Sequence, residues 1–497
     1  MFPYKTSIQL DRNSDHALYL QLSNQIIQFI KNRTLAPKVK LPGSRALAEL
    51  LQVHRNTVVA CYDELSLQGW VESIPKKGTF VLRDLPVLRH RKLSDSVALD
   101  VQKRAGFRFY RNDILSPKPG GRKKGFMYLD DGISDGRLTP IDEIARTYRR
   151  ISAKKKISEH LSYGSTYGND TLREVLVEYL NSTRGLQIGE ENVLITRGSQ
   201  MGIWLSAQLL FQKKDVIVVG STNYQSADAT FLNQRARLER VSVDANGIVT
   251  DEIENLCKRK QIKAVYVTSH HHHPTTVTLS AQRRIHLLNL ANRYNFAIIE
   301  DDYDYDFNYD HAPILPLASH DTNGNVIYIG SVCKTVAPVF RVGYLIASKE
   351  FVDEAAKLRG FVDRQGDALL ELTFADFIKS GDLDRHIRKV MRIYHRRRDF
   401  FCTLSKDELG DFFECEIPKG GMAVWARLNL KYSWEVVSTV ATKHRLKIGD
   451  WQRYDSAGMG HNGIRIGFAS STEAEIRELI GRLKKTMKEI EGSVKNT

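Results

Sequence analysis

Short apolar runs in the middle of the chain most constrain what it can fold into. They cover residues 216–219, 264–267, 297–299 and 326–329, and helical stretches separate them. Apolar runs of this length that alternate with helices are typical of a mainly parallel sheet. From Met127 onward the sequence therefore predicts an α/β domain with a large, mainly parallel sheet, and a smaller α/β unit from about residue 350.

The first 82 residues follow a different pattern. An amphipathic first helix is marked by apolar residues at helical spacing: Leu22, Ile26, Phe29 and Ile30. Ser44 is expected to cap a short helix over residues 45–51, and a second helix begins at Arg55 after a tight turn. Residues 71–74 and 79–82 then flank a basic turn, as in a hairpin. The sequence thus predicts a winged helix-turn-helix over residues 1–82.

Positive charge gathers at the front of this 497-residue chain, whose formal net charge is +15. Residues 1–82 carry ten Lys/Arg against six Asp/Glu, and residues 83–126 carry twelve against four. Since residues 83–126 also lack periodicity, we interpret them as a basic linker, either a solvated tether or a further contact with a polyanion. The charge distribution favours nucleic acid as the partner of the front.

Cysteine usage and apolar patterning indicate the compartment. The five cysteines are scattered and form no CxxC pair, which fits a reducing environment. The start of the chain does not read as a signal peptide, and no apolar run is long enough to span a bilayer. We therefore expect a soluble, cytoplasmic protein.

The start of the second helix predicts contacts with DNA bases. Arg55, Asn56 and Thr57 stand where a helix-turn-helix enters the major groove, and Arg and Asn can each pair bidentately with a purine edge. The residues expected at phosphates or the minor groove are Arg45, Lys76, Lys77 and Gly78. Taken singly, each charge also fits a solvated surface, so the prediction depends on their joint pattern.

A lysine in a tight turn of small residues predicts a cofactor site. Lys334 has Arg341 seven positions on, and upstream an apolar strand ends in acids that include Asp301. Such a lysine can form a Schiff base with pyridoxal phosphate (PLP), and Asp301 would keep the pyridine nitrogen protonated. Tyr303, on the same face of the strand, is expected to donate to the ring hydroxyl. The 33 residues between Asp301 and Lys334 match one strand–helix–strand passage to the neighbouring strand.

The phosphate of the cofactor has its own predicted contacts. Arg341 supplies a guanidinium group, and Ser199 and Gln200 open a helix whose N-terminal amides suit an anion. We assign Ser331, just before the lysine turn, to the same site. Alone, the Gly-Ser-Gln sequence more often marks an ordinary helix cap.

These motifs together resemble a known family. Residues 41–50, 53–59 and 69–73 closely resemble the GntR-type winged helix, with Gly43 where that family more often has serine. Further matching segments are residues 163–164, 168, 172–174, 300–304 and 465–469. Except for the linker, the whole chain resembles the MocR/GabR-type bacterial regulators, in which a GntR winged helix is fused to a domain like a fold-type I aminotransferase.

The resemblance implies further roles. Tyr224 would stack on the pyridine ring, and Arg465 would clasp the carboxylate of an amino-acid-like effector. Tyr163 would reach the phosphate of the partner subunit, in a head-to-tail homodimer whose winged helices cross to the other protomer.

Three segments depart from the family pattern, and one of them, residues 220–224, lacks the usual Pro-Gly turn. Four histidines, residues 270–273, stand where relatives have a different polar stretch. Neighbours on an extended chain point to opposite faces, so at most two could share an ion, and we predict no metal site. Instead His271 or His273 is expected to bond the cofactor. In addition, Cys333 replaces the serine that is common before the lysine.

Three functions fit these motifs. The first is a transcription regulator in which an amine or amino-acid effector displaces Lys334 from PLP as an external aldimine, with the protein on the nucleoid when bound to operator DNA. The second is an active aminotransferase with a DNA-binding appendage. The third is a sensor of PLP itself. The linker and basic front favour regulation, since a free enzyme has no need of them.

Overall fold

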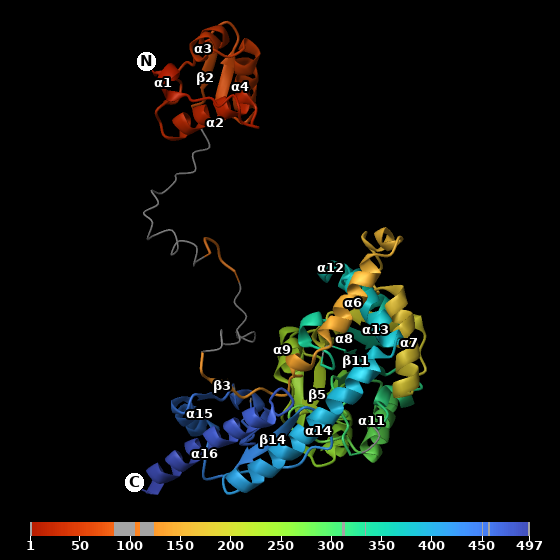
Figure 1. Ribbon diagram of the computed structural model, residues 1–497. Helices are drawn as coiled ribbons and strands as arrows, with labels where there is room; N and C mark the ends of the chain where they lie inside the picture. Colours follow the sequence, from red (N-terminus) through yellow and green to blue (C-terminus); the bar gives the residue numbers. More distant parts are fainter. Residues whose placement is uncertain are drawn as a thin grey trace. The chain divides into compact units, whose positions relative to one another are not determined.

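The chain divides into two compact units, residues 1–111 and residues 112–497. The computed structural model describes residues 2–83, 105–109, 124–310, 314–332, 334–449, 451–455 and 458–495 (Figure 1). Most of the predicted linker and Cys333 lie outside these residues. No helix in the described part of the chain is long and apolar enough to cross a bilayer.

The first unit is a helical domain with one hairpin. Its elements are α1 (Tyr4–Ser7), α2 (Leu18–Lys31), α3 (Ser44–Leu51), α4 (Arg55–Leu67), β1 (Val71–Ile74) and β2 (Gly78–Val81). The strands pair antiparallel with Val71 opposite Val81. Val58, Tyr62 and Leu65 on α4 are buried, and α4 packs on α2. The winged helix-turn-helix fold is confirmed.

The predicted cap of α3 is wrong by one position. Ser44 is the first helical residue, and Gly43 stands at the N-cap without a side-chain bond. Because Ser44 already has helical backbone, its hydroxyl is not where a cap oxygen accepts from the first turn. The next helix is capped by a side chain, since Nδ1 of His54 accepts a hydrogen bond from the backbone N–H of Asn56 at 3.3 Å.

The second unit is built on a seven-stranded sheet. In spatial order its strands are β4 (Val193–Thr196), β12 (Gly343–Ile346), β11 (Val326–Ser331), β10 (Ala297–Asp302), β9 (Ala264–Val267), β5 (Val216–Gly220) and β6 (Arg237–Val241). β12 runs antiparallel to both of its neighbours, and the pairs from β11 to β6 are all parallel. The prediction of a mainly parallel sheet is confirmed.

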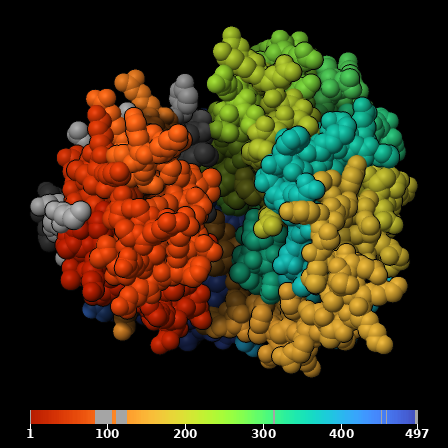
Figure 2. Space-filling view, turned by 90° about the horizontal axis from the view of Figure 1, so that it is seen from above, coloured from red at the N-terminus to blue at the C-terminus, as the bar shows by residue number. Residues whose placement is uncertain are grey.

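Helices cover both faces of this sheet. They are α6 (Ile141–Ser152), α7 (Asp170–Arg184), α8 (Ser199–Leu210), α9 (Gln225–Asn233), α10 (Thr250–Cys257), α11 (Ala281–Tyr294), α12 (Lys349–Val362) and α13 (Ala368–Lys379). Side chains of α7, α11 and α13 share one core with Ile298 and Tyr328, and those of α8, α9 and α12 share another with Ile299 and Ile327. This alternation follows the two-residue period of a strand buried on both faces. α6 packs on α13, and their gold and cyan surfaces adjoin in Figure 2.

A third core of this unit lies around a smaller, three-stranded antiparallel sheet. Its elements are α14 (Asp382–Leu409), β13 (Phe413–Cys415), β14 (Ala423–Leu428), α15 (Trp434–Lys443), β16 (Gly463–Gly467) and α16 (Glu473–Lys495). A capping box precedes α16, because Thr472 Oγ1 accepts from Glu475 N–H and Glu475 Oε2 accepts from Thr472 N–H. The chain enters this core early, since β3 (Met127–Tyr128) pairs with β15 (Leu446–Lys447).

Short elements complete the second unit. They are η1 (Gly136–Leu138), η2 (Ile157–His160), η3 (Glu190–Asn192), β7 (Val243–Asp244), β8 (Gly247–Ile248), η4 (Leu317–His320), η5 (Pro338–Phe340) and η6 (Trp451–Asp455).

The connection from β10 to β11 differs from the predicted strand–helix–strand passage. The two strands are parallel neighbours, as expected, but the described residues between them hold the short η4 and no α-helix. The segment instead reaches the core of the smaller sheet: Phe307 is buried there, and Tyr309 N–H donates to Lys419 O at 3.0 Å. Burial of Phe307 on the smaller sheet outweighs helix formation in this stretch.

Candidate functional site

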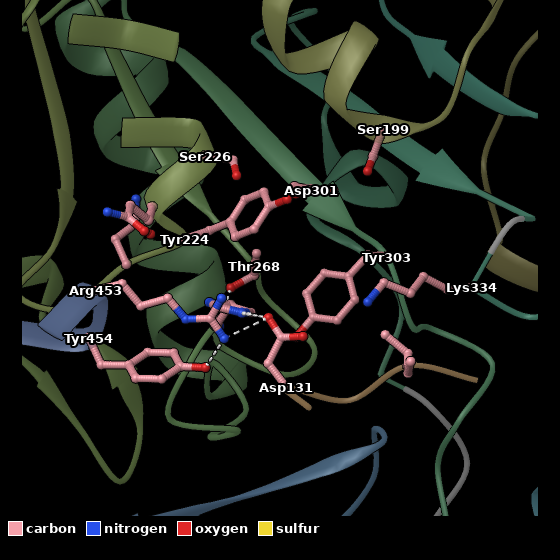
Figure 3. A pocket seen from close by; sticks show the side chains of 14 residues that line it. Asp131, Ser199, Tyr224, Ser226, Thr268, Asp301, Tyr303, Lys334, Arg453 and Tyr454 are labelled. Atoms are coloured by element: carbon pink, nitrogen blue, oxygen red, sulfur yellow. Dashed lines mark hydrogen bonds and ion pairs between the residues drawn. The ribbon is translucent and has the colours of Figure 1, made fainter. Parts of the chain in front are cut away.

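A cavity of about 230 Å³ lies at the carboxyl ends of the central parallel strands. It is lined by Asp131, Ile133, Ser199, Asn223, Tyr224, Gln225, Ser226, Thr268, His273, Asp301, Tyr303, Lys334, Arg453 and Tyr454 (Figure 3). Ligands of open α/β sheets bind outside this edge, where successive strands end. The sequence predicted six of these residues as contacts of the cofactor. Ser199 was predicted for its phosphate, and the other five are Lys334, Asp301, Tyr303, Tyr224 and His273.

Lys334 extends into the cavity from the turn after β11. Its Nζ donates to the main-chain carbonyl of Gly132 at 3.1 Å and lies 5.5 Å from the ring centre of Tyr303. Ser331, at the end of β11, does not line the cavity, because its hydroxyl donates to Val342 O at 3.2 Å. The structure therefore brings Lys334 to the site and places the Ser331 side chain outside the lining.

Asp301 is a buried carboxyl whose two oxygens have different surroundings. Oδ2 accepts a hydrogen bond from the hydroxyl of Tyr266 on β9 at 2.8 Å. Oδ1 is buried and has no partner among the described residues. Burial raises the pKa of Asp301 from 3.8 to about 7, with the charge of Asp302 adding to the rise and Tyr266 and Lys334 opposing it. A buried oxygen without a partner is costly, so Oδ1 suits a cationic or N–H donor from a ligand.

Aromatic rings form the wall beside Asp301. Tyr224 and His273 meet edge to face with ring centres 5.1 Å apart. Burial, with the charge of Arg465, lowers the pKa of His273 well below its usual value, so this imidazole is neutral at pH 7. The hydroxyl of Tyr303 donates to the carbonyl of His271 at 2.9 Å, so its hydrogen is already used within the protein.

The other histidines of the run turn away from the cavity, each to its own partner. Nδ1 of His270 lies 3.2 Å from Asp302, that of His271 lies 2.9 Å from Asp304, and that of His272 lies 2.8 Å from Thr275 Oγ1. Of the two histidines predicted to contact a cofactor, His273 lines the cavity and His271 does not.

The predicted phosphate contacts surround the N-terminus of α8. Gly198 caps this helix with φ of +76°, and a Cβ there would come within 2.8 Å of the Arg341 guanidinium. Arg341 donates to the carbonyl of Arg197 at 2.6 Å. Gln200 turns aside, because its Nε2 donates to Thr230 Oγ1 at 2.9 Å. Ser199 therefore lines the cavity at the amide end of α8, whereas Gln200 and Arg341 do not, although Arg341 lies beside Gly198 at the start of this helix.

Two further predicted residues lie outside the lining. Arg465, on β16, is buried and donates from Nε to Asp131 O at 2.8 Å and from a terminal nitrogen to Pro274 O at 3.2 Å. Tyr163 is 77% exposed and stacks under the guanidinium of Arg364 at 4.4 Å.

Sequence reasoning missed an ion pair in the cavity. Arg453, on η6, lies 3.1 Å from Oδ2 of Asp131, and Figure 3 shows the Asp131 carboxylate between Arg453 and Lys334. Although burial opposes it, Arg453 and then Lys334 hold the pKa of Asp131 well below its usual range. Tyr266, the partner of Asp301, was missed as well. Its position directly before the end of a predicted strand was the one available signal.

The predicted DNA-binding residues lie on the surface of the first unit. Arg55 and Asn56 are exposed in the first turn of α4, and Lys76 and Lys77 are exposed in the turn between β1 and β2. Arg45 is exposed on α3, Thr57 is half-buried and Gly78 begins β2. Lys40, which is not among those predictions, lies beside β2 with its Nζ 5.9 Å from the ring centre of Phe80.

The fold and the site define an aminotransferase-like domain, with a lysine after one parallel strand and a buried aspartate on its neighbour. The profile of aminotransferase class I and II matches residues 127–483. The chain belongs to that family, and its front matches the bacterial regulatory proteins of the gntR family over residues 18–81. It therefore joins a GntR helix-turn-helix to an aminotransferase class I/II domain.

Similar proteins fall into two groups. One spans the whole chain: the probable rhizopine catabolism regulatory protein MocR of Rhizobium meliloti is 26% identical over 97% of this chain and 96% of its own length. The regulator NorG of Staphylococcus aureus is 25% identical over 91% of this chain and all of its own length.

The other group matches the second unit. Aromatic-amino-acid aminotransferase 1 of Thermococcus litoralis is 28% identical over 73% of this chain and 88% of its own length. The crystal structure of a multiple substrate aminotransferase from Thermococcus profundus superposes with a TM-score of 0.70 at 26% identity, covering 74% of this chain and 92% of the other.

Proposed function

We propose that the protein is a DNA-binding transcription regulator that holds PLP on Lys334 and responds to an amine or amino-acid effector. The observation that carries the proposal is the presence, in one chain, of a winged helix with exposed basic residues and a cavity that pairs Lys334 with Asp301. MocR and NorG, named as regulators, match this chain along 96% and all of their own length. In a homodimer, Tyr163 would extend to the site of the partner subunit.

The residues of the cavity fit PLP. Oδ1 of Asp301 is the buried acceptor that a protonated pyridine nitrogen requires, and Tyr224 supplies an aromatic face. Ser199, the amides of α8 and Arg341 offer positive character for the phosphate. When bound, PLP supplies an aldehyde that forms a covalent bond with a primary amine and a ring that accepts electrons.

The residues of this chain would turn that chemistry into recognition. Lys334 would hold PLP through its Nζ, which in this structure donates to Gly132 O, and the primary amine of an effector would compete with Nζ for the cofactor. Arg465 would receive the effector carboxylate, since the carbonyls of Asp131 and Pro274 orient its guanidinium without cancelling its charge. A change in DNA binding follows only if the effector has different affinities for two states of the protein.

In the first unit, Arg55 and Asn56 would read base edges and the wing lysines Lys76 and Lys77 would contact phosphates. The test begins by selecting a binding sequence from random duplex DNA with the full-length protein. Wild type and Lys334→Ala are then compared on that sequence for affinity. The proposal expects equal DNA affinity without effector, and PLP retained covalently by wild type alone. A protein that selects no sequence would contradict the regulator role.

A working aminotransferase is the second candidate. The chain has Lys334, Asp301 and Arg465, and the Thermococcus relatives are named as aminotransferases. An enzyme would convert many equivalents of amino acid and keto acid, at rates near the usual range of about 1–1000 per second. We measure turnover with the full-length protein, and sustained turnover in that range would favour the enzyme. A single slow half-reaction would not.

A further inference from the structure

Three basic side chains in or beside the cavity contact one dipeptide, Asp131-Gly132. Lys334 Nζ donates to Gly132 O at 3.1 Å, Arg465 Nε donates to Asp131 O at 2.8 Å, and Arg453 pairs with Asp131 Oδ2 at 3.1 Å. The two arginines meet different groups. Arg465 contacts neutral carbonyls and keeps its charge, whereas Arg453 contacts a carboxylate that neutralises it.

The backbone around Asp131 is firmly held. Asp130 Oδ1 accepts from the N–H groups of Gly132 and Ile133 at 2.8 and 3.2 Å, and Asp130 O accepts from Gly467 N–H at 2.8 Å. A Cβ on Gly132 would meet the Cβ of Ala423 at 3.0 Å, so the segment is packed directly on the smaller sheet. The carboxylate of Asp131 is therefore a fixed part of the cavity wall.

Other charges do not replace this carboxylate. Asp304, whose charge also acts on Arg465, is buried, bonds His271 at 2.9 Å and does not line the cavity. Asp301 would be used by the pyridine nitrogen. Among the described lining residues, the acidic side chains are Asp301 and Asp131. Asp131 is therefore the carboxylate that the protein itself places at Arg453.

We propose that Asp131 acts as a built-in second carboxylate that selects effectors with one carboxylate and an uncharged side chain. The inference rests on the proposed function, in which Arg465 takes the effector's carboxylate. A second carboxylate on the effector would have to compete with Asp131 for Arg453, and it would be repelled by Asp131 itself. A cationic side chain would lie beside Arg453, which disfavours it as well.

Isosteric probes test this selection. We titrate the PLP-loaded full-length protein with L-glutamine and L-glutamate, which differ in side-chain charge, and follow the absorption of the bound cofactor. Wild type should bind glutamine about tenfold more tightly than glutamate. Asp131→Asn should raise the affinity for glutamate by about tenfold and change the affinity for glutamine by less than about threefold. Asp244→Asn, which removes an exposed carboxylate paired with Arg283, is the matched control and should change neither.

A reciprocal pair separates selection from general damage. Arg453→Gln removes the ion-pair partner of Asp131 and should weaken the binding of both probes. The double variant Asp131→Asn with Arg453→Gln makes this wall neutral again and should recover glutamine binding. An unchanged glutamine-to-glutamate ratio in Asp131→Asn would overturn the inference and leave the proposed function standing. Tighter binding of L-lysine than of glutamine by wild type, lost in Asp131→Asn, would overturn it too, since Asp131 would then recognise a cation. If none of the three amino acids alters the cofactor absorption of any variant while borohydride still fixes PLP on Lys334, the inference is overturned and the proposed function, which also admits other amines, stands.

Discussion

The hydroxyl of Tyr266 lies 2.8 Å from Oδ2 of Asp301, while Oδ1 of the same carboxyl has no partner among the described residues. Tyr266 therefore orients Asp301 and leaves one oxygen for a ligand. Removing this bond in Tyr266→Phe should weaken PLP binding by about tenfold, since a hydrogen bond to a charged group contributes about 1.5 kcal/mol or more. Equilibrium dialysis against PLP measures the change. Tyr328→Phe, which removes a similar bond to the neighbouring Asp302, should weaken PLP binding far less.

The raised pKa of Asp301 also predicts that the folding stability of the cofactor-free protein depends on pH. Its pKa is about 7 in the folded state and about 3.8 when unfolded, so the folded state binds the proton more tightly. Its contribution to stability is fully present below pH 3.8 and is lost as the pH rises through 7. Asp301→Asn removes the titration, so its stabilising effect relative to wild type should grow between pH 5 and pH 7.5 and then level off. Thermal unfolding of the second unit at each pH measures it.

The neighbouring carboxyl supplies a control of opposite sign. Although burial opposes it, His270 lowers the pKa of Asp302. Its contribution is therefore present above the unfolded pKa and is lost as the pH falls through the folded value. Asp302→Asn should destabilise the protein at pH 7.5. A stabilising effect of both variants at pH 7.5 would contradict the opposite environments assigned to the two carboxyls.

Lys334 should be the residue that holds the cofactor. Borohydride reduction of the PLP-loaded protein should fix the cofactor on Nζ of Lys334, because this lysine lines the cavity with Asp301 and Tyr224. Peptide mapping by mass spectrometry locates the adduct, and Lys349→Ala, which changes an exposed lysine, should not affect it. An adduct on another lysine would refute the cofactor site.

Arg55 and the wing lysines Lys76 and Lys77 should contribute to DNA binding in different ways. Arg55→Ala should cost about 1–3 kcal/mol at the selected DNA sequence and relax the preference at one base pair, since Arg55 is exposed in the first turn of α4. Lys76→Ala and Lys77→Ala should weaken all sequences alike, each lowering the slope of affinity against salt by about one. Equal loss of specific and random binding in Arg55→Ala would place that residue at the phosphates instead.

Local patterns were enough to predict much of this protein. The period of the apolar residues gave the central strands and the winged helix, and the residue types around Lys334 and Asp301 indicated a cofactor. Those residues reach the cavity because each follows or ends a parallel strand, and such strand ends meet at one edge.

Other features depend on contacts between distant segments. Asp131 and Arg453 are 322 positions apart, and their pairing arises because the start of the second unit packs beside β16 and η6. The stretch after β10 contains aromatic residues that favour burial in the smaller core over a helix of its own. The antiparallel direction of β12 likewise depends on its pairing with β11 and β4, since a short apolar strand has the same sequence pattern in either direction.

The central claim is that an effector acts on DNA binding through Lys334. The most direct measurement is the affinity of full-length protein for its selected DNA sequence, with PLP present, as an amino acid is added to wild type and to Lys334→Ala. We predict that an amino acid that alters the cofactor absorption of wild type also changes its DNA affinity or footprint, and that Lys334→Ala binds DNA equally well and does not respond. An equal response of both proteins, or none in a wild type whose cofactor absorption has changed, would contradict the account.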